Sequence, residues 1–338
     1  MTDNAMTPAP AAPQRRPFRL PEEIGVIIAL LVMVAIIGVA RPNFLGAMNL
    51  FSLLGHATFL GMLAVGMVFL LAIREIDLSV GWMFNFSAVF SAILMTSGID
   101  PWLAFGGGIL FGAVLGLVNG VIAVSLRLPA IIVTLGTYSM FQGLSLVMNQ
   151  GRAIVPSDTS SLFFSFFKMR LFGIAPVAGL VFIALAVVLH LVLHRTRFGY
   201  RVQAVGSNPD AAKLAGIPTG LVRLQTLVIM GAICGLSGAM YVGYRGAIDP
   251  IEGSNYVLVV VAAVIIGGTP LSGGHGTIIG AVIGMLIIQV ISSGLIFFGI
   301  DAKWSTFVTG AVIVLAVSLD QLIKYQRTRR ANRIKTDG

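Results

Sequence analysis

RTRFGYRVQAVGSNPDAAKLAGIP, from Arg195 to Pro218, is a polar and basic stretch between two apolar runs of roughly 20 residues each. Five Lys or Arg residues lie between Arg195 and Arg223, against the single acid Asp210. Apolar runs of that length can cross a bilayer, and a charged stretch between them has to lie in water. The stretch therefore divides the chain into membrane-spanning parts joined by an aqueous loop.

The same stretch contains the signals of a short helix. Asn208 suits the N-cap, Pro209 suits the first helical position, and Gly216 stands where a helix of about two turns would end. The sequence thus predicts a small water-exposed helix that a partner protein can hold.

The composition indicates an integral membrane protein. Hydrophobic residues make up 57% of the 338 residues and charged residues only 10%, far from the balance of a soluble domain. The net charge of +9 resides in loops and tails, while aromatic residues lie mostly within apolar segments, which argues against nucleic-acid binding. The single cysteine, Cys234, excludes an intramolecular disulfide.

Windows of about 20 apolar residues predict an all-α integral membrane protein with about ten transmembrane helices. The predicted spans are residues 24–40, 51–73, 79–97, 102–125, 130–149, 174–194, 222–244, 255–268, 277–298 and 304–323. The eighth is short and ambiguous. We expect residues 1–23 to form a disordered tail, 24–323 the transmembrane domain with an aqueous loop at 195–222, and 324–338 a basic tail.

The distribution of charge predicts the orientation. If the N-terminus is cytoplasmic, 16 of the 22 Lys and Arg residues lie on the inner side. Because basic loops are retained in the cytoplasm, this arrangement is favoured over its reverse. Both termini and the 195–222 loop are then expected to be cytoplasmic.

A weak internal repeat appears when the chain is shifted by 172 positions. The shift pairs Ile76-Asp77 with Ile248-Asp249, Gly108 with Gly280, Gly112 with Gly284, Thr134 with Thr306, and Thr137 with Thr309. An offset of five helices would make the two halves inverted copies, an arrangement common in transport proteins. Chance alignment in a chain with 40 glycines is the alternative.

Glycines recur every four residues in two of the predicted spans. The two series are Gly108, Gly112, Gly116 and Gly120, and Gly276, Gly280 and Gly284. This spacing clears one helix face and favours close helix packing in lipid, and sliding of the two seams during gating is the alternative.

Two short motifs lie between spans. GGTPLSGGHG, from Gly267 to Gly276, lacks the Gly-Lys-Ser/Thr of a phosphate loop, so we read it as a tight cytoplasmic turn in which Gly273 and Gly274 are turn or gate candidates. The sequence offers no means of hydrolysing ATP in this chain.

EIDLSVG, from Glu75 to Gly81, joins the second and third spans and supplies the gate candidates Asp77, Ser79 and Gly81. Asp77 suits the cap of the third helix, or else the turn forms an inner gate. A location at the cytoplasmic membrane edge would make the cost of desolvating its acids small.

Neutral polar residues remain inside the spans, where almost no charge is found. The candidates for a solute path are Asn85, Asn119, Thr134, Thr137, Tyr138, Gln142 and Gln289. The lack of charge argues against a proton-coupled pump or an ion channel, whereas a hydroxyl-rich solute needs such neutral donors and acceptors. Hydrogen bonding between helices is the alternative for each residue.

The sequence contains no zinc-type Cys/His cluster, HExxH or GxSxG motif, so neither a metal site nor an enzyme is expected. His190 and His194 share a helix face but have no third ligand candidate nearby.

Several motifs follow one another in order: EIDLSVG from Glu75, PAIIVTLG from Pro129, RFGY from Arg197, GSNPDAA from Gly206, GI from Gly216 and GGTPLSGG from Gly267. Together they resemble the motifs of permease subunits of bacterial ABC importers for monosaccharides, in the ribose, xylose, rhamnose and autoinducer branch. The resemblance extends from about Gly25 to about Leu322.

The resemblance implies a bacterial inner-membrane pore without a cofactor of its own. It implies a second permease copy, identical or different, a cytoplasmic ATP-binding subunit, and a periplasmic or tethered sugar-binding protein, in addition to membrane lipid. The residues that match the family's ATPase-coupling helix are Asn208, Pro209, Asp210, Ala211, Ala212, Lys213, Leu214 and Gly216.

Related branches import branched amino acids or nucleosides. Arg74-Glu75 and Trp82 depart from the commonest sugar pattern, which leaves the solute open. A stand-alone facilitator or channel, whose basic loop binds only lipid headgroups, is the alternative from another class.

Overall fold

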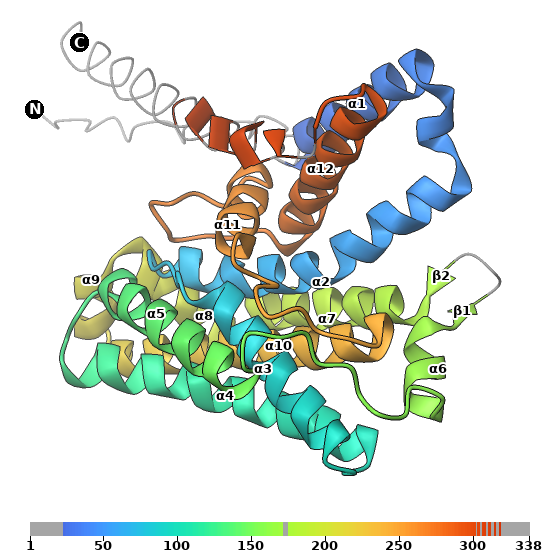
Figure 1. The fold of residues 1–338 in the computed structure, drawn as a ribbon. Helices are drawn as coiled ribbons and strands as arrows, with labels where there is room; N and C mark the ends of the chain where they lie inside the picture. Colours follow the sequence, from blue (N-terminus) through green and yellow to red (C-terminus); the bar gives the residue numbers. More distant parts are fainter. Residues whose placement is uncertain are drawn as a thin grey trace, which may run out of the picture.

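The computed structural model describes residues 23–171 and 175–301, together with 303, 304, 306–308, 310, 311, 314, 315 and 318. This part of the chain is nearly all helical, as predicted (Figure 1). Its elements are α1 (Glu23–Ala40), η1 (Pro42–Leu45), α2 (Ala47–Ala72), α3 (Val80–Thr96), α4 (Pro101–Ser125), α5 (Ala130–Met148), α6 (Leu162–Lys168), β1 (Arg170–Leu171), β2 (Ala175–Pro176), α7 (Val177–Arg195), α8 (Arg197–Ser207), α9 (Pro209–Leu214), α10 (Thr219–Arg245), α11 (Tyr256–Ile266) and α12 (Ile278–Phe297). The two short strands pair antiparallel with each other.

Nine predicted spans coincide with apolar helices, namely α1 to α5, α7, α10, α11 and α12. Seven of these are long and apolar enough to cross a membrane, while α3 and α11 are shorter. The chain is therefore a multi-pass membrane protein. The predicted tenth span, 304–323, falls largely outside the described residues, as do the predicted tails except for Glu23.

The polar loop contains one more helix than predicted. Sequence analysis found α9 but missed α8, which precedes it. The Thr196 hydroxyl accepts a hydrogen bond from the Gly199 amide at 3.2 Å and so caps α8. Val202 and Val205 are buried on one face of α8, which holds this helix against the bundle. The short α6 was also missed.

α2 forms the centre of the bundle. Every residue from Ala57 to Ala72 is buried, because α10, α11, α12 and α7 all pack against this helix. α9 lies at one end of the layer that contains α2, α4 and α10, and the β1–β2 pair lies at the other (Figure 1). We call these two ends the α9 side and the β1 side.

The internal repeat is present in the helix order. Adding 172 to the bounds of α2, α3 and α4 gives 219–244, 252–268 and 273–297, which correspond to α10, α11 and α12. α2 ends on the α9 side, whereas α10 begins there, so the two copies run in opposite directions. α4 packs on α10, and its counterpart α12 packs on α2. The two halves are thus inverted copies around the α2–α10 pair.

Gly81 and Gly253, which differ by the same 172 positions, lie where the two copies meet. A Cβ atom on either glycine would collide with the carbonyl oxygen of the other. Gly253 also has a φ of +91°, which favours glycine. The two backbones therefore approach each other reciprocally in the middle of the fold, where only glycine fits.

The glycine seams pack as the sequence predicted. A Cβ on Gly112 would lie 2.7 Å from the Cα of Gly235 and would also meet the Gly231 carbonyl. In the second half, Gly284 has the same relation to the backbone of Ala263. Contact between backbones replaces the hydrophobic driving force that is missing between helices in lipid.

We expect Gly112→Leu to destabilise the protein by roughly 1–3 kcal/mol, because the side chain has to separate α4 from α10. The matched control is Gly106→Leu on the same helix, since a Cβ there meets nothing within 4 Å. Thermal unfolding of the two purified variants in detergent measures the difference. Equal melting temperatures would contradict the packing argument.

Candidate functional site

α9 has the ends that the sequence predicted. The Asn208 side-chain oxygen accepts hydrogen bonds from the amides of Asp210 and Ala211 at 3.1 and 3.0 Å, and Pro209 occupies the first turn. Gly216 follows the helix with a φ of +78°, in the left-handed region. Caps of this kind contribute about 1 kcal/mol to a short helix.

The surface of α9 is largely exposed. Ala212 is buried against the bundle, whereas Asp210, Ala211 and Lys213 are exposed. Leu214 is 91% exposed and adds a large apolar side chain to this face of the helix. This face combines charged groups with one large apolar side chain, as contact surfaces for other proteins do.

The base of α9 is attached directly to the end of α2 through Arg74. The Arg74 guanidinium donates to the carbonyls of Gly206 and Ser207, at 2.5 and 2.6 Å. These two residues end α8 and immediately precede Asn208. Arg74 itself has a φ of +66°, so its backbone is held in a conformation that non-glycine residues seldom adopt.

The glycine-rich turn joins this junction. The amide of Gly274 donates to the carbonyl of Ala72, the last residue of α2, at 2.9 Å. Gly273 and Gly274 both have positive φ, so the predicted tight turn is confirmed. A Cβ on Gly206 would lie 2.6 Å from the Gly274 amide nitrogen, which leaves no space for a side chain. The ends of α2 and α8 and this turn therefore meet backbone to backbone.

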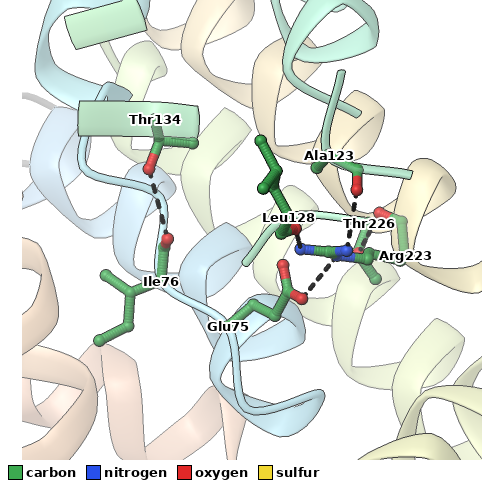
Figure 2. Close-up of polar contacts among 7 residues, drawn as sticks. All are labelled: Glu75, Ile76, Ala123, Leu128, Thr134, Arg223 and Thr226. Atoms are coloured by element: carbon green, nitrogen blue, oxygen red, sulfur yellow. Dashed lines mark hydrogen bonds and ion pairs between the residues drawn. The ribbon is translucent and has the colours of Figure 1, made fainter. Parts of the chain in front are cut away.

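Next to Arg74, Glu75 forms an ion pair with Arg223 of α10, with 2.5 Å between Oε1 and Nε (Figure 2). The Arg223 guanidinium also donates to the carbonyls of Ala123, at 3.1 Å, and Leu128. Both side chains are 17% exposed. One cation thus ties the α2–α3 turn, the end of α4 and the start of α10 together.

Arg223 was expected only as part of the basic loop, so this role was missed. Its position in the second turn of a mostly apolar helix was the available signal.

Asp77 lies deeper than predicted. It was expected at a membrane edge where desolvation costs little, but its side chain is fully buried. Its Oδ1 accepts from the amide and hydroxyl of Ser79, at 2.8 and 2.6 Å, and its Oδ2 lies 3.4 Å from the Asn119 amide nitrogen. Ser79, not Asp77, occupies the N-cap position of α3, but the Asp77 carboxylate accepts a hydrogen bond from the Ser79 amide just before this helix, so its roles as a cap or a gate stay predictions.

Burial raises the pKa of the Asp77 carboxyl to about 6, although the hydrogen bonds from Ser79 and Asn119 act to lower it. The turn is further held by Thr134 of α5, whose hydroxyl accepts from the Leu78 amide at 3.0 Å and also lies near the Ile76 carbonyl (Figure 2).

The predicted path residues fall into two groups. Asn85, Asn119 and Thr134 are buried and bond to neighbouring segments; Asn85, for example, donates to the Asp249 carbonyl at 3.0 Å and accepts from Ser145 at 2.6 Å. Thr137 is also buried, and its hydroxyl donates to the Thr134 carbonyl of its own helix. Tyr138, Gln142 and Gln289 are partly exposed. Tyr138 packs edge-on against Trp82, and Gln289 lines a small cavity between α11 and α12. Roles in a path stay predictions for both groups.

Among the described residues, no group of three or more His, Cys, Asp or Glu side chains is placed to hold a metal ion. The rings of His190 and His194 lie 4.5 Å apart, and the His194 Nδ1 is within 3.0 Å of the His190 carbonyl. Their stacking is local to the end of α7.

We expect acidification to stabilise the protein through Asp77. A carboxyl with a folded-state pKa near 6, against 3.8 for an ordinary aspartate, binds its proton more tightly in the folded state. The free energy of unfolding therefore rises as the pH falls from 7 through 6 and the buried Asp77 carboxyl takes up its proton. Asp77→Asn should remove this part of the pH dependence of the melting temperature in detergent, while Asp210→Asn, at an exposed position, should keep it. A wild-type pH dependence in Asp77→Asn would contradict the assignment.

Comparisons with known proteins agree with this architecture. The family model described as "Branched-chain amino acid transport system / permease component" matches residues 49–317. Three curated relatives are permeases named for sugars.

The ribose import permease protein RbsC of Bacillus subtilis (strain 168) is 36% identical, over 89% of this chain and 93% of the relative. The L-arabinose ABC transporter permease protein AraH of Azospirillum brasilense is 32% identical, over 94% and 93%. The D-allose transport system permease protein AlsC of Escherichia coli (strain K12) is 33% identical, over 92% and 96%. The chain therefore belongs to the permease family that this model describes.

Proposed function

We propose that the chain is the membrane pore of an ATP-driven importer for a monosaccharide, moved by a separate ATP-binding subunit that docks on α9. The observation that carries the proposal is α9 itself, a capped helix with an exposed leucine and a base that is bonded to the central helix of the bundle. A helix that only contacted lipid headgroups would not need this attachment.

The route for movement follows the contacts. A shift of α9 moves the carbonyls of Gly206 and Ser207, which hold Arg74. Arg74 continues into Glu75, and the Glu75–Arg223 ion pair connects that turn with α10. Because α2 and α10 are the equivalent central helices of the inverted halves, a displacement at α9 reaches both halves.

The partners follow from the same arrangement. Because the sequence contains no phosphate loop, we propose that a separate ATP-binding subunit supplies the energy. This subunit would lie in the cytoplasm, on the same side as the 195–222 loop, the tail at 1–23 and the basic tail at 324–338. A second permease copy would complete the pore around the transmembrane domain at 24–323. A sugar-binding protein would deliver the solute on the β1 side.

The solute class rests on the relatives. Those quoted above are named for ribose, arabinose and allose, whereas the family description names branched-chain amino acids. We assign a monosaccharide because the full-length relatives are sugar permeases and because the polar groups within the spans are mostly neutral.

We expect Leu214→Asp to abolish ATP-dependent uptake in vesicles that contain all subunits, because it places a charge where an apolar contact has to form. Stimulation of ATP hydrolysis by the loaded binding protein should be lost together with uptake. Ser157→Asp, at an exposed position in the loop after α5, is the control and should transport normally.

Uptake of D-ribose, L-arabinose, D-allose and L-leucine is measured in the same wild-type vesicles. Uptake by the purified chain without ATP would identify a facilitator and overturn the proposal. Uptake of leucine alone would assign the amino-acid branch instead.

We expect Arg74→Ala to keep the ATP-binding subunit bound and ATP hydrolysis active, but to lower the amount of sugar imported per ATP. The substitution removes both bonds to the base of α9 and leaves its exposed face intact. Arg127→Ala is the matched control, because Arg127 also ends a helix on the α9 side with a positive φ of 54°. An unchanged ratio of uptake to hydrolysis in Arg74→Ala would show that movement takes another route.

A further inference from the structure

The segment 246–255, between α10 and α11, is the second-half counterpart of the turn that holds Asp77. It returns into the bundle from the β1 side, because Gly253 contacts Gly81 and the Asp249 carbonyl accepts from Asn85 of α3. Ile248 also pairs with Ile154 of the neighbouring loop through two backbone hydrogen bonds, each 3.0 Å long. Irregular backbone at this depth is tolerated where it is buried in protein or lines a polar cavity.

The segment lines an open cavity of about 480 Å³ at its surface, a volume within the roughly 300–1,000 Å³ of small-molecule sites. Its lining includes the side chains of Asp249, Glu252, Ser254, Asn255 and Tyr256. The Tyr256 hydroxyl donates to the Glu252 carboxylate, which fixes the carboxylate beside an aromatic ring. Carboxylate oxygens accept hydrogen bonds from hydroxyl groups, and an aromatic ring offers an apolar face to a ring-shaped solute.

A second cavity lies next to the first. It measures about 150 Å³ and shares the lining residues Asn255 and Tyr256 with it. Gln289 and Ser292 of α12 also line this second cavity, so it offers neutral donors and acceptors beside the carboxylates of the first. Among the described residues, no Lys or Arg lines either cavity, which disfavours an anionic ligand.

The position in the fold points to the same conclusion. α3 and α11 are the two short apolar helices, and they occupy corresponding places in the inverted halves. Short or interrupted helices in such places are where transporters of inverted-repeat architecture bind their solutes. In the first half, the acids of the equivalent turn bond to protein groups, namely Asp77 to Ser79 and Glu75 to Arg223. In the second half, the acids of the turn line an open cavity.

We propose that these two adjacent cavities form an entry site for a neutral, polyhydroxylated solute on the β1 side. Asp249 and Glu252 accept its hydroxyl groups, Tyr256 contacts its carbon face, and Asn255, which lines both cavities, lies between the carboxylates and the polar groups of Gln289 and Ser292. The inference rests on the proposed function and adds to it the residues that receive the solute on the β1 side.

The first test measures transport in vesicles with all subunits. We expect Glu252→Gln to lower sugar uptake roughly tenfold, the effect of losing a hydrogen bond to a charged group. Hydrolysis of ATP stimulated by the binding protein should stay near the wild-type rate, because α9 is untouched. The control is Asp158→Asn, whose carboxylate bonds only to Ser160 of its own turn and lies outside both cavities.

The second test detects occupancy directly. Native Cys234 is fully buried, so Asn255→Cys introduces one accessible thiol. Millimolar D-ribose, L-arabinose, D-allose or D-galactose is expected to slow labelling of this thiol by a membrane-impermeant maleimide. Labelling of Ser157→Cys, in an exposed loop on the same side, should not change.

The outcomes separate the two proposals. If wild-type vesicles import none of these sugars, the proposed function fails. If they import a sugar while Glu252→Gln transports at the wild-type rate and that sugar leaves the labelling of Asn255→Cys unchanged, only the entry site is overturned.

Discussion

The fold depends on providing hydrogen-bond partners for the backbone amides and carbonyls of two irregular turns inside an apolar bundle. Where α2 and α10 end, the chain turns back into the bundle before a short helix begins, and each turn exposes amides and carbonyls that lipid cannot satisfy. The side chains of Thr134 and Asn85 complete the two turns, and Gly81 and Gly253 let them meet. Because a side chain at either glycine would push the turns apart, the arrangement of both halves follows from this one contact.

The contacts at the base of α9 follow the same logic. Arg74 satisfies two carbonyls at the end of α8, and the Gly274 amide satisfies the last carbonyl of α2. Hydrogen bonds that complete helix ends also fasten three segments together. A force applied to α9 is therefore transmitted through bonds that the fold needs in any case, and no separate linkage is required.

The sequence predicted what depends on local signals. The spans follow from apolar length, α9 from Asn208, Pro209 and Gly216, and the tight turn from Gly273 and Gly274. The depth of Asp77 could not be predicted, because it depends on how far the turn returns between α4 and α5. The Glu75–Arg223 pair joins residues 148 positions apart in the chain, and nothing local to either one indicates the other. α8 was not predicted although Thr196 is a suitable cap, because the basic residues of that stretch indicated only a water-exposed loop.

The two equivalent turns differ in what their acids do. Glu75 and Asp77 have protein partners, a guanidinium and the groups of Ser79 and Asn119, and these bonds make the first turn a rigid connection. In the second turn, Asp249 and Glu252 line open space, and the Tyr256 hydroxyl donates to the Glu252 carboxylate. A carboxylate oxygen that already accepts hydrogen bonds from protein groups, as Oδ1 of Asp77 does, has less capacity left to accept from a solute. In the mechanism that we propose, the first half therefore transmits force and the second half receives the solute, because the acids of the two equivalent turns have different surroundings.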